Sequence, residues 1–224
     1  MTIAFFDLDK TLISENSANL WVRLQWKQGR LTKKQLFKLY SGLIQYKLGM
    51  AHLENHFHQA IKHIKGQVYA DLEADARHFY QTQIRHLFRP GALSALESHK
   101  KKGDTNIILS TSPKAFASLA AEELGMAHCL ASEFEVDALG YCTGNWIKPV
   151  CYGAGKLEIA TRWLKTQGLS LSDCVFYTDS YTDMPMLEAV GHPVVVNPDR
   201  RLSRAAKIKK WPIVDWGRNR VAKI

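Results

Sequence analysis

The sequence predicts an α/β fold: a doubly wound, Rossmann-like parallel sheet with an all-helical segment inserted after its first strand. Short apolar runs alternate with amphipathic helical patterns along most of the chain, and residues 14–89 interrupt this alternation with helical spacing alone. Strands that alternate with helices are typical of right-handed β-α-β units in one open sheet. With 224 residues, 46% of them hydrophobic, the chain can form one full core and a small second lobe.

The strands are expected where continuous apolar runs occur, because strands buried on both faces of a parallel sheet show this pattern. These runs are residues 3–8, 105–110, 128–132, 174–178 and 192–197. Helical patterns lie between them at residues 90–103, 113–125 and 155–168, and the last two end at glycine, which a helix C-cap favours. Residues 134–146 alternate around Ala-Leu-Gly and predict a β-hairpin lying over the sheet edge.

The predicted domain division follows from these patterns. Residues 1–13 and 90–224 form the α/β core, residues 14–89 form a helical cap, and residues 199–224 are a basic C-terminal segment of the core. The insertion contains His52 and His56, whose i, i+4 spacing can bind a transition metal on a helix. A solvated helix face is the simpler interpretation, since no third ligand is placed by the sequence.

The charge is unevenly distributed. Residues 14–89 carry 12 Lys and Arg against 5 Asp and Glu, residues 199–224 carry 9 against 2, and residues 90–198 carry 8 against 12. A net charge of +9 is compatible with nucleic acid, anionic lipid or phosphorylated metabolites as partners, and does not choose among them. The basic C-terminal segment is either a solvated end or a contact for an anionic membrane surface, with Trp211 and Trp216 as interfacial anchors.

The cysteines and the N-terminus indicate the compartment. The four cysteines form no C-x-x-C pair and no zinc-like cluster, so we interpret them as reduced thiols. The N-terminus has no basic region followed by a long apolar stretch, and no segment approaches the length of a membrane-spanning helix. We therefore expect a cytoplasmic protein.

Carboxylates follow two of the predicted strands. Asp7 and Asp9 lie at the end of the first strand, and residues i and i+2 of an extended strand point to the same side. Asp179 ends another buried strand, and Asp183 follows it by four residues at the start of a helical pattern. Ligands of open α/β sheets bind beyond the carboxyl ends of the strands, so these four side chains are expected to face one site.

Convergent carboxylates repel one another unless a cation neutralises them. Oxygen ligands without His or Cys favour a hard cation, and few carboxylates combined with substrate phosphate are a common way to bind Mg²⁺. Ser110 and Thr111 follow a strand and precede a helix, where a hydroxyl and backbone N–H groups can hold phosphate oxygens. Lys156, in the first turn of another helix, is interpreted as a mobile positive charge able to reach the anion, with an ordinary solvated lysine as the alternative.

These motifs, taken in order, resemble a known family. "DLDKT" (7–11), Ser110 after an apolar strand, Lys156 in "GAGK" and "DSYTD" (179–183) resemble the four signature motifs of the haloacid dehalogenase (HAD) superfamily. They span nearly the whole chain outside the insertion. The insertion looks like the C1-type cap of the phosphoserine-phosphatase-like branch, subfamily IB, and "GHPVVVNPDRRL" (191–202) resembles the same branch.

The resemblance implies a phosphatase that cleaves a phosphate monoester through an aspartyl-phosphate. Asp7 would be the nucleophile, and Asp9 the general acid and then the general base. Mg²⁺ would be held by Asp7, the main-chain carbonyl of Asp9 and Asp179, with Asp183 supporting it directly or through water. Three side chains would bind the phosphoryl group, namely Ser110, Thr111 and Lys156. Thr11 would fix the loop that carries Asp9.

The substrate is expected to be a small phosphorylated metabolite or a lipid phosphate. Asn16 stands where phosphoserine phosphatases of this branch carry an acidic residue that grips the substrate, and Glu15 lies beside it. The most similar members of the branch include histidinol-phosphatase-like proteins and a phosphatidylglycerophosphate phosphatase. A phosphoacceptor signalling or anion-binding protein, using the same Mg²⁺ site without turnover, is the alternative. A nucleic-acid module led by the basic tail would leave the ordered carboxylates unexplained.

Overall fold

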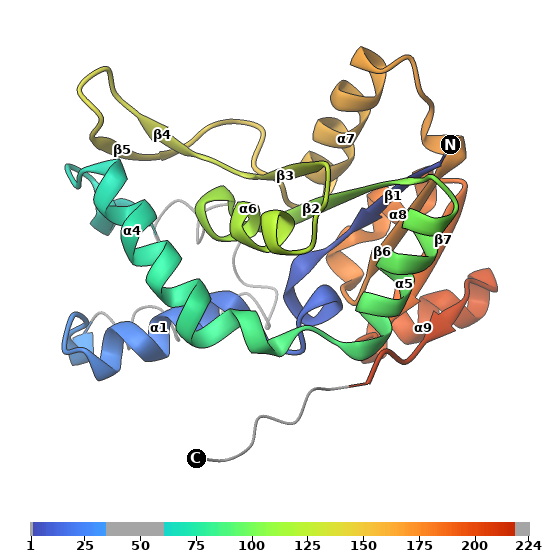
Figure 1. Ribbon diagram of the computed structural model, residues 1–224, viewed down its shortest axis with the longest axis horizontal. Coiled ribbons are helices and arrows are strands. Elements are labelled where there is room, and N and C mark those ends of the chain that lie inside the picture. Colours follow the sequence, from blue (N-terminus) through green and yellow to red (C-terminus); the bar gives the residue numbers. More distant parts are fainter. Residues whose placement is uncertain (1, 35–60, 218–224) are drawn as a thin grey trace.

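The computed structural model describes residues 2–34 and 61–217 (Figure 1). Its centre is a six-stranded sheet of order β3-β2-β1-β6-β7-β8 in which every neighbouring pair is parallel. The strands are β1 (Ile3–Phe6), β2 (Thr105–Pro113), β3 (His128–Ser132), β6 (Cys174–Thr178), β7 (His192–Val196) and β8 (Ile213–Val214). The predicted parallel α/β sheet is confirmed. The strand β8 is not among the predicted strands, because two residues are too few to show an apolar strand pattern.

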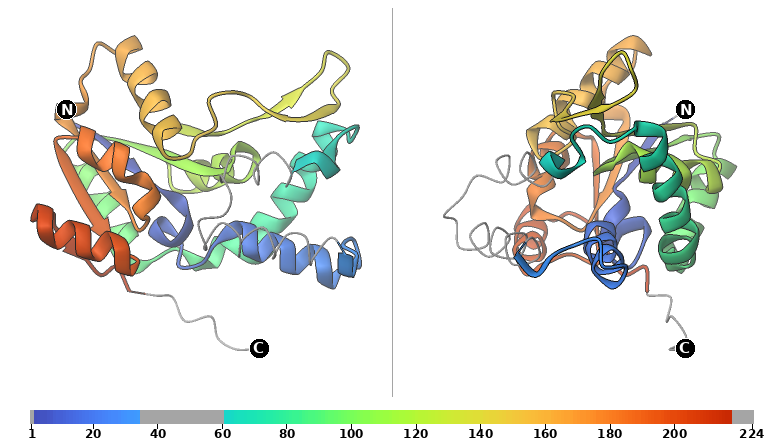
Figure 2. Two further views of the ribbon diagram at one scale, coloured as in Figure 1. Left: turned by 180° about the vertical axis from the view of Figure 1, so that it is seen from behind. Right: turned by 90° about the vertical axis from the view of Figure 1, so that its left-hand side faces the viewer.

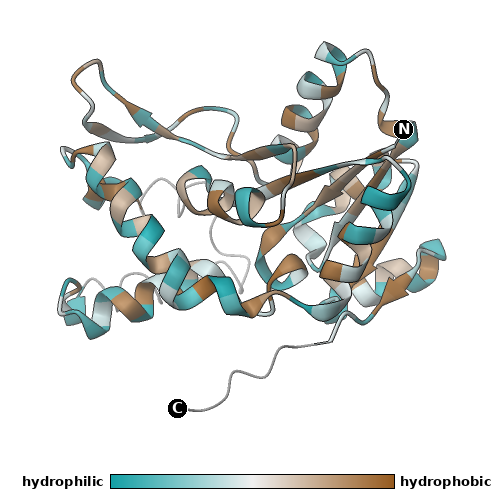
Figure 3. Cartoon of the chain, in the orientation of Figure 1, coloured by the Kyte–Doolittle hydropathy of each residue, from teal (hydrophilic) through white to brown (hydrophobic). Residues whose placement is uncertain are grey.

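Helices cover both faces of the sheet. One face carries α5 (Pro90–Lys101) and α6 (Lys114–Glu123), and the other carries α7 (Ala154–Thr166), α8 (Met184–Ala189) and α9 (Arg200–Lys209). Alternate residues of β1 enter the two cores: Ala4 and Phe6 pack in the first, and Ile3 and Phe5 in the second. β1 is therefore apolar along its whole length, and stretches of the central strands are brown in Figure 3.

The described part of the insertion is helical. It comprises α1 (Ser17–Lys27), α4 (Tyr69–Phe79) and the short turns η2 (Lys62–Ile64), η3 (Tyr80–Ile84) and η4 (Arg85–Leu87). Trp21 of α1, Phe79 of α4 and Phe116 of α6 join this cap to the core through ring contacts of 5.1–5.3 Å between centroids. His52 and His56 lie outside the described residues.

The insertion leaves and re-enters the core through two adjacent segments. Ile13 forms an antiparallel bridge with Phe88. The Ser14 amide donates to the Leu87 carbonyl at 2.9 Å, and the Arg89 amide donates to the Leu12 carbonyl at the same distance. The two connections between cap and core are thus tied side by side.

The predicted hairpin exists, and its position differs from the prediction. Strands β4 (Phe134–Val136) and β5 (Cys142–Trp146) are antiparallel, and they extend toward the cap instead of covering the sheet edge (Figure 2). The Gly66 amide of the cap donates to the Cys142 carbonyl at 2.8 Å. Cys142 and Trp146 bury their side chains against the cap residues Ile61 and Ile64, and this apolar contact determines where the hairpin lies.

The basic C-terminal segment is folded into the core as far as Gly217, because α9 packs on the sheet and β8 pairs with β7. Trp216 is 8% exposed and packs against Phe6 and Tyr177. The expectation that Trp216 anchors the protein at a membrane surface is therefore wrong. Trp211 is partly buried in the second core and is not a free anchor either.

Two further observations concern the cysteines and the lengths of the helices. All four cysteines lie within the described residues, and each is a free thiol, as expected: Cys129, Cys142, Cys151 and Cys174. Within residues 2–34 and 61–217, no helix has the length and apolar composition needed to cross a membrane.

Candidate active site

The first site loop begins where β1 ends. Asp7 follows Phe6 directly, and the irregular turn η1 (Leu8–Leu12) then reverses the chain so that the Leu12 amide donates to the Asp7 carbonyl at 3.3 Å. Lys10 adopts a left-handed backbone conformation with φ of 58°. Arg89 holds this turn, since its Nε donates to the Lys10 carbonyl at 3.2 Å. The turn brings both carboxylates to the same side of the strand end.

The turn opens onto a cavity of about 150 Å³ beyond the carboxyl ends of β1, β2 and β6. Every predicted site residue except Glu15 lines it. Glu15 is exposed, and its carbonyl accepts from the Lys10 amide at 3.1 Å, so this residue supports the turn through its main chain. The lining residues are Asp7, Asp9, Lys10, Asn16, Ser110, Thr111, Lys156, Asp179, Ser180, Thr182 and Asp183.

Lys156 lies at the centre of the site. Its Nζ is 2.8 Å from Asp7 Oδ1 and 2.8 Å from Asp183 Oδ2, and the residue is 1% exposed. Burial alone would lower the pKa of Lys156, but the attraction of Asp183 and Asp7 outweighs it and raises that pKa above its usual value. The prediction of a mobile or solvated lysine is wrong, because two buried carboxylates fix the ammonium group.

The start of α7 determines where Lys156 enters the site. Gly155 packs so closely against the preceding turn that a Cβ atom there would lie 2.0 Å from the Val150 carbonyl oxygen. A side chain at this position would therefore push the first turn of α7 away from Val150. Glycine lets the helix begin at the distance from which Lys156 reaches Asp7.

Two carboxylates of the site have strongly raised pKa values. Burial raises the pKa of Asp7 to about 7, against the opposing attraction of Lys156, and repulsion from Asp183 adds to it. Burial and repulsion from Asp7 raise the pKa of Asp179 to about 8, with Lys10 opposing. The surrounding amino acids alone therefore do not fully stabilise the charged form of these two carboxyl groups.

Asp9 is held by hydrogen bonds from two directions. Its Oδ1 accepts from the Ser17 amide at 2.9 Å, and its Oδ2 accepts from the Ser17 and Ser112 hydroxyls at 3.0 Å each. Burial raises the pKa of Asp9, and the hydrogen bonds from Ser17 and Ser112 partly oppose that rise. A carboxyl group with a raised pKa is suited to donate a proton and later to accept one.

Sequence reasoning missed Ser17 and Ser112 as functional residues. Ser112 could have been found from the strand period, because β2 continues to Pro113 and residues 110 and 112 fall on the same side of it. Ser110 itself is buried, and its hydroxyl accepts from the Ser112 amide at 3.2 Å. Ser17 comes from the cap, and no sequence signal places it next to Asp9.

Asn16 has a structural role that its sequence position did not reveal. Its Oδ1 accepts from the Asn19 amide at 2.9 Å and caps α1. Its Nδ2 reaches toward Asp9 Oδ2 at 3.4 Å. Asn16 thus fixes the N-terminus of α1, and with it the Ser17 amide, against Asp9.

The second acidic loop is tied to the first. The Asp179 amide donates to the Thr11 hydroxyl at 3.0 Å, so Thr11 links the loop that carries Asp9 to this second loop. Asp183 Oδ2 accepts from Thr178 Oγ1 at 2.7 Å as well as from Lys156. Asp183 Oδ1 is buried and has no hydrogen-bond partner among the described residues. A buried carboxylate oxygen is costly without a partner, so this oxygen is suited to contact a cation.

The residues present fit a hard divalent cation. The unpartnered oxygen of Asp183 and the raised pKa values of Asp7 and Asp179 all report negative charge in need of a cation. Over the described residues, no three His, Cys, Asp or Glu side chains are grouped as a complete metal site. Such an ion would therefore also need main-chain or substrate oxygens, as is common for Mg²⁺.

Comparisons with known proteins agree with this geometry. Residues 4–188 match the family model of haloacid dehalogenase-like hydrolases. A probable phosphatase of Mycobacterium tuberculosis is 32% identical over 97% of this chain and 76% of its own length. A histidinol-phosphatase of Neisseria meningitidis is 29% identical over 96% of this chain and 98% of its own.

A solved structure of a Bordetella pertussis protein of unknown function superposes with a TM-score of 0.88 at 25% identity, covering 96% of this chain and 98% of that one. The similarity thus extends through the cap and the C-terminal elements as well as the core. Matched along its length and carrying the ordered carboxylates of that family, the chain belongs to the haloacid dehalogenase-like hydrolases and is a phosphoric monoester hydrolase.

Proposed function

We propose that this chain hydrolyses the phosphate monoester of a small metabolite through an aspartyl-phosphate on Asp7. The contact that carries the proposal is the 2.8 Å approach of Lys156 Nζ to Asp7 Oδ1 at the base of a cavity that Asp9 also lines. It holds a carboxylate oxygen beside a fixed positive charge, where an entering phosphoryl group is attracted to both the charge and the nucleophile.

In the first step an Asp7 oxygen attacks phosphorus, and the bond from phosphorus to the ester oxygen breaks. Asp9 donates its proton to that leaving oxygen, so the alcohol departs neutral. In the second step Asp9 accepts a proton from water, the water oxygen attacks phosphorus, and inorganic phosphate leaves as Asp7 is regenerated. Splitting the reaction in this way lets one carboxyl group act as acid and then as base.

Lys156, Ser110 and Thr111 bind the transferring phosphoryl group in this proposal. Lys156 supplies charge, while Ser110 and Thr111 supply a hydroxyl and main-chain N–H groups near the start of α6. These contacts hold phosphorus in line with Asp7, and positioning with charge stabilisation provides most of the rate enhancement in such reactions.

Phosphatases of this family are generally metal-dependent, and Mg²⁺ is the cofactor that we propose here. Asp7, the Asp9 main-chain carbonyl and Asp179 would hold it, and the free oxygen of Asp183 would support it directly or through water. When bound, Mg²⁺ would neutralise charge that the carboxylates and the phosphoryl oxygens share.

The size and polarity of the cavity support a small polar substrate. About 150 Å³ between charged side chains has room for a phosphoryl group and a small polar leaving group. Asn16 stands at its rim with its amide engaged by Asp9 and by α1, so it shapes the rim without offering a charge. The full-length similarity to a protein named histidinol-phosphatase supports amino-alcohol phosphates as the first substrates to assay.

The test compares hydrolysis of an aryl phosphate and an alkyl phosphate, with and without Mg²⁺. Asp7→Asn should abolish turnover of both esters. Asp9→Asn should lose about 10²–10⁴-fold, and more with the alkyl phosphate, because its leaving alcohol needs a proton. Asp173→Asn, on an exposed turn, is the matched control and should keep wild-type rates.

Full activity of Asp7→Asn would refute the nucleophile assignment. A wild-type protein that is phosphorylated stably on Asp7 and does not turn over would instead indicate the phosphoacceptor alternative. Equal losses on both esters in Asp9→Asn would remove Asp9 from the role of general acid and leave it only the second step.

A further inference from the structure

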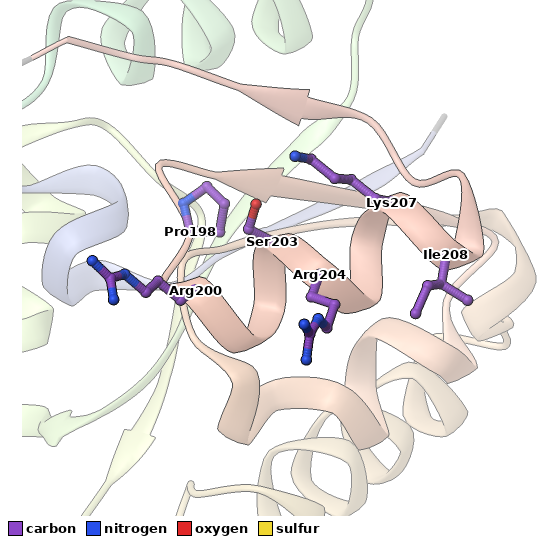
Figure 4. A pocket seen from close by; sticks show the side chains of 6 residues that line it. All are labelled: Pro198, Arg200, Ser203, Arg204, Lys207 and Ile208. Carbon is purple, nitrogen blue, oxygen red and sulfur yellow. The ribbon is translucent and has the colours of Figure 1, made fainter.

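The outer face of α9 carries a groove that is separate from the candidate active site. Its volume is about 560 Å³, and it shares no lining residue with the site cavity (Figure 4). The helix turns its inner side, Leu202 and Ala206, toward the sheet, where both are buried. The groove is lined by Pro198, Arg200, Ser203, Arg204, Lys207 and Ile208.

The basic residues of α9 fall into two groups. Arg201 stacks on the Tyr181 ring at 4.1 Å, and Lys209 pairs with Glu188 at 2.8 Å. By contrast, Arg200, Arg204 and Lys207 form no ion pair with a carboxylate of the described residues. The groove therefore presents a row of cations whose charge nothing in the described part of the chain offsets.

An apolar side chain lies in the same stripe as these cations. Positions 200, 204, 207 and 208 recur at the helical period, so they share the outer face of α9. Ile208 is 76% exposed. A helix with cations around an exposed aliphatic side chain is typical of surfaces that lie in the headgroup region of a membrane.

From these observations we propose that the outer face of α9 docks on an anionic phospholipid membrane. The unpaired guanidinium and ammonium groups complement lipid phosphates, and Ile208 enters the boundary between headgroups and acyl chains. Nucleic acid fits less well, because none of the groove residues is aromatic and Ile208 would face phosphates. The surface belongs to α9 alone and does not use Trp211 or Trp216.

The experiment measures co-sedimentation of the full chain with vesicles. Wild type should bind vesicles that contain phosphatidylglycerol, should not bind phosphatidylcholine vesicles, and should lose binding between about 0.1 M and about 1 M salt. Arg204→Glu combined with Lys207→Glu should weaken binding by at least about fivefold for each cation removed. Ile208→Ser should weaken it less, and its loss should not depend on salt.

The matched control is Lys100→Glu combined with Lys165→Glu, two exposed lysines on α5 and α7 that give the same change in net charge. It should keep most of the vesicle binding. Hydrolysis of a soluble aryl phosphate should be unchanged in all of these variants, which separates this proposal from the fate of the proposed function.

Three outcomes would overturn the proposal. The first is wild type that ignores anionic vesicles. The second is a control pair that loses as much binding as the α9 pair, since net charge alone would then explain the result. The third is tight binding of a short nucleic-acid duplex that depends on Arg204 and Lys207 while vesicles do not bind.

Discussion

Asp9 receives hydrogen bonds from two serines that lie far apart in the sequence. Ser17 begins the cap and Ser112 ends β2, and each hydroxyl is 3.0 Å from the same carboxylate oxygen. Since a hydrogen bond to the charged form favours ionisation, the pair tunes the proton affinity of Asp9 as well as its position. The general acid is thus supported jointly by cap and core.

Ser17→Ala and Ser112→Ala should each raise the pKa of Asp9 further, because each removes a hydrogen bond that stabilises its carboxylate. Release of the leaving alcohol needs protonated Asp9, so the fall of the rate at high pH should move to higher pH. The rate itself should fall about tenfold for each lost bond. The pH profile of kcat on an alkyl phosphate measures both effects.

Ser94→Ala, an exposed serine on α5, is the control for this pair of variants and should leave the profile in place. An unchanged pH profile in Ser17→Ala and Ser112→Ala, with only the melting temperature lowered, would mean that the serines serve the fold alone.

Much of the site could be predicted from single residues, for a physical reason. The position of strand ends was enough to bring Asp7, Asp9, Ser110 and Asp179 to one cavity. The i, i+2 period was not what orients Asp7 and Asp9, because β1 ends at Phe6 and the turn η1 places both carboxylates. The partners of Asp9 could not be predicted, because Ser17 reaches it through the folding of the cap. The burial of Lys156 depends on packing of α7 that sequence spacing does not contain.

At the scale of elements, α7 positions the charge of the site through its first turn. The glycine at 155 allows this approach, and the helix then runs 13 residues from Ala154 to Thr166. Element types were predictable where the apolar period was long, as in α7 itself. The strand β8 has only two residues, and its pairing with β7 comes from tertiary contact.

Gly155→Ala should lower activity strongly, since the new Cβ would meet the Val150 carbonyl oxygen at 2.0 Å and displace Lys156. We expect a loss of about 1–3 kcal/mol in the free energy of unfolding as well. Urea unfolding and the kcat of aryl phosphate hydrolysis measure the two effects.

Gly168→Ala, just past the other end of α7, is the matched control. Its φ is +68° but no atom of the described residues lies within 4 Å of the new Cβ, so it should cost about 1 kcal/mol of stability and keep its activity. Equal activity in the two variants would contradict the assignment of Gly155 as the residue that positions Lys156.

At the scale of the whole molecule, the charged carboxylates of the site lower the free energy of unfolding when no cation is bound. The pKa values of Asp7 and Asp179 rise from 3.8 to about 7 and about 8. At pH values between 3.8 and these raised pKa values, the folded protein binds more protons than the unfolded chain. Stability contributed by these protons is present at low pH and is lost as pH rises through the folded pKa values.

In a chelator, the melting temperature should therefore fall as pH rises from about 5 to about 8, and added Mg²⁺ should raise it more at the higher pH. Differential scanning calorimetry across this range measures both trends. Asp179→Asn should flatten the pH dependence and reduce the effect of Mg²⁺. A melting temperature that rises with pH in the metal-free protein would contradict the raised pKa values.

The reactivity of the cysteine thiols measures how well their side chains are buried. Burial raises the pKa of Cys129 to about 11, against a partly opposing hydrogen bond from Ser118, and burial also raises that of Cys174 to about 11. Native protein should react slowly with a thiol-specific disulfide reagent near about pH 8, because the reactive thiolate is scarce. All four thiols should react quickly in denaturant, and one fast native thiol would disprove this packing.

The paired connections at Ile13 and Phe88 have a consequence for how such a protein can evolve. The insertion begins and ends on two bridged segments. The core therefore contacts the same pair of connected segments, whatever the length of the chain inserted between them. The entropy of closing a loop grows only with the logarithm of its length, so different caps can be exchanged there at little cost to the core. Exchange of the inserted segment at these two connections can change the substrate while the carboxylates of the core stay the same, provided that each new cap supplies a hydrogen-bond donor to Asp9.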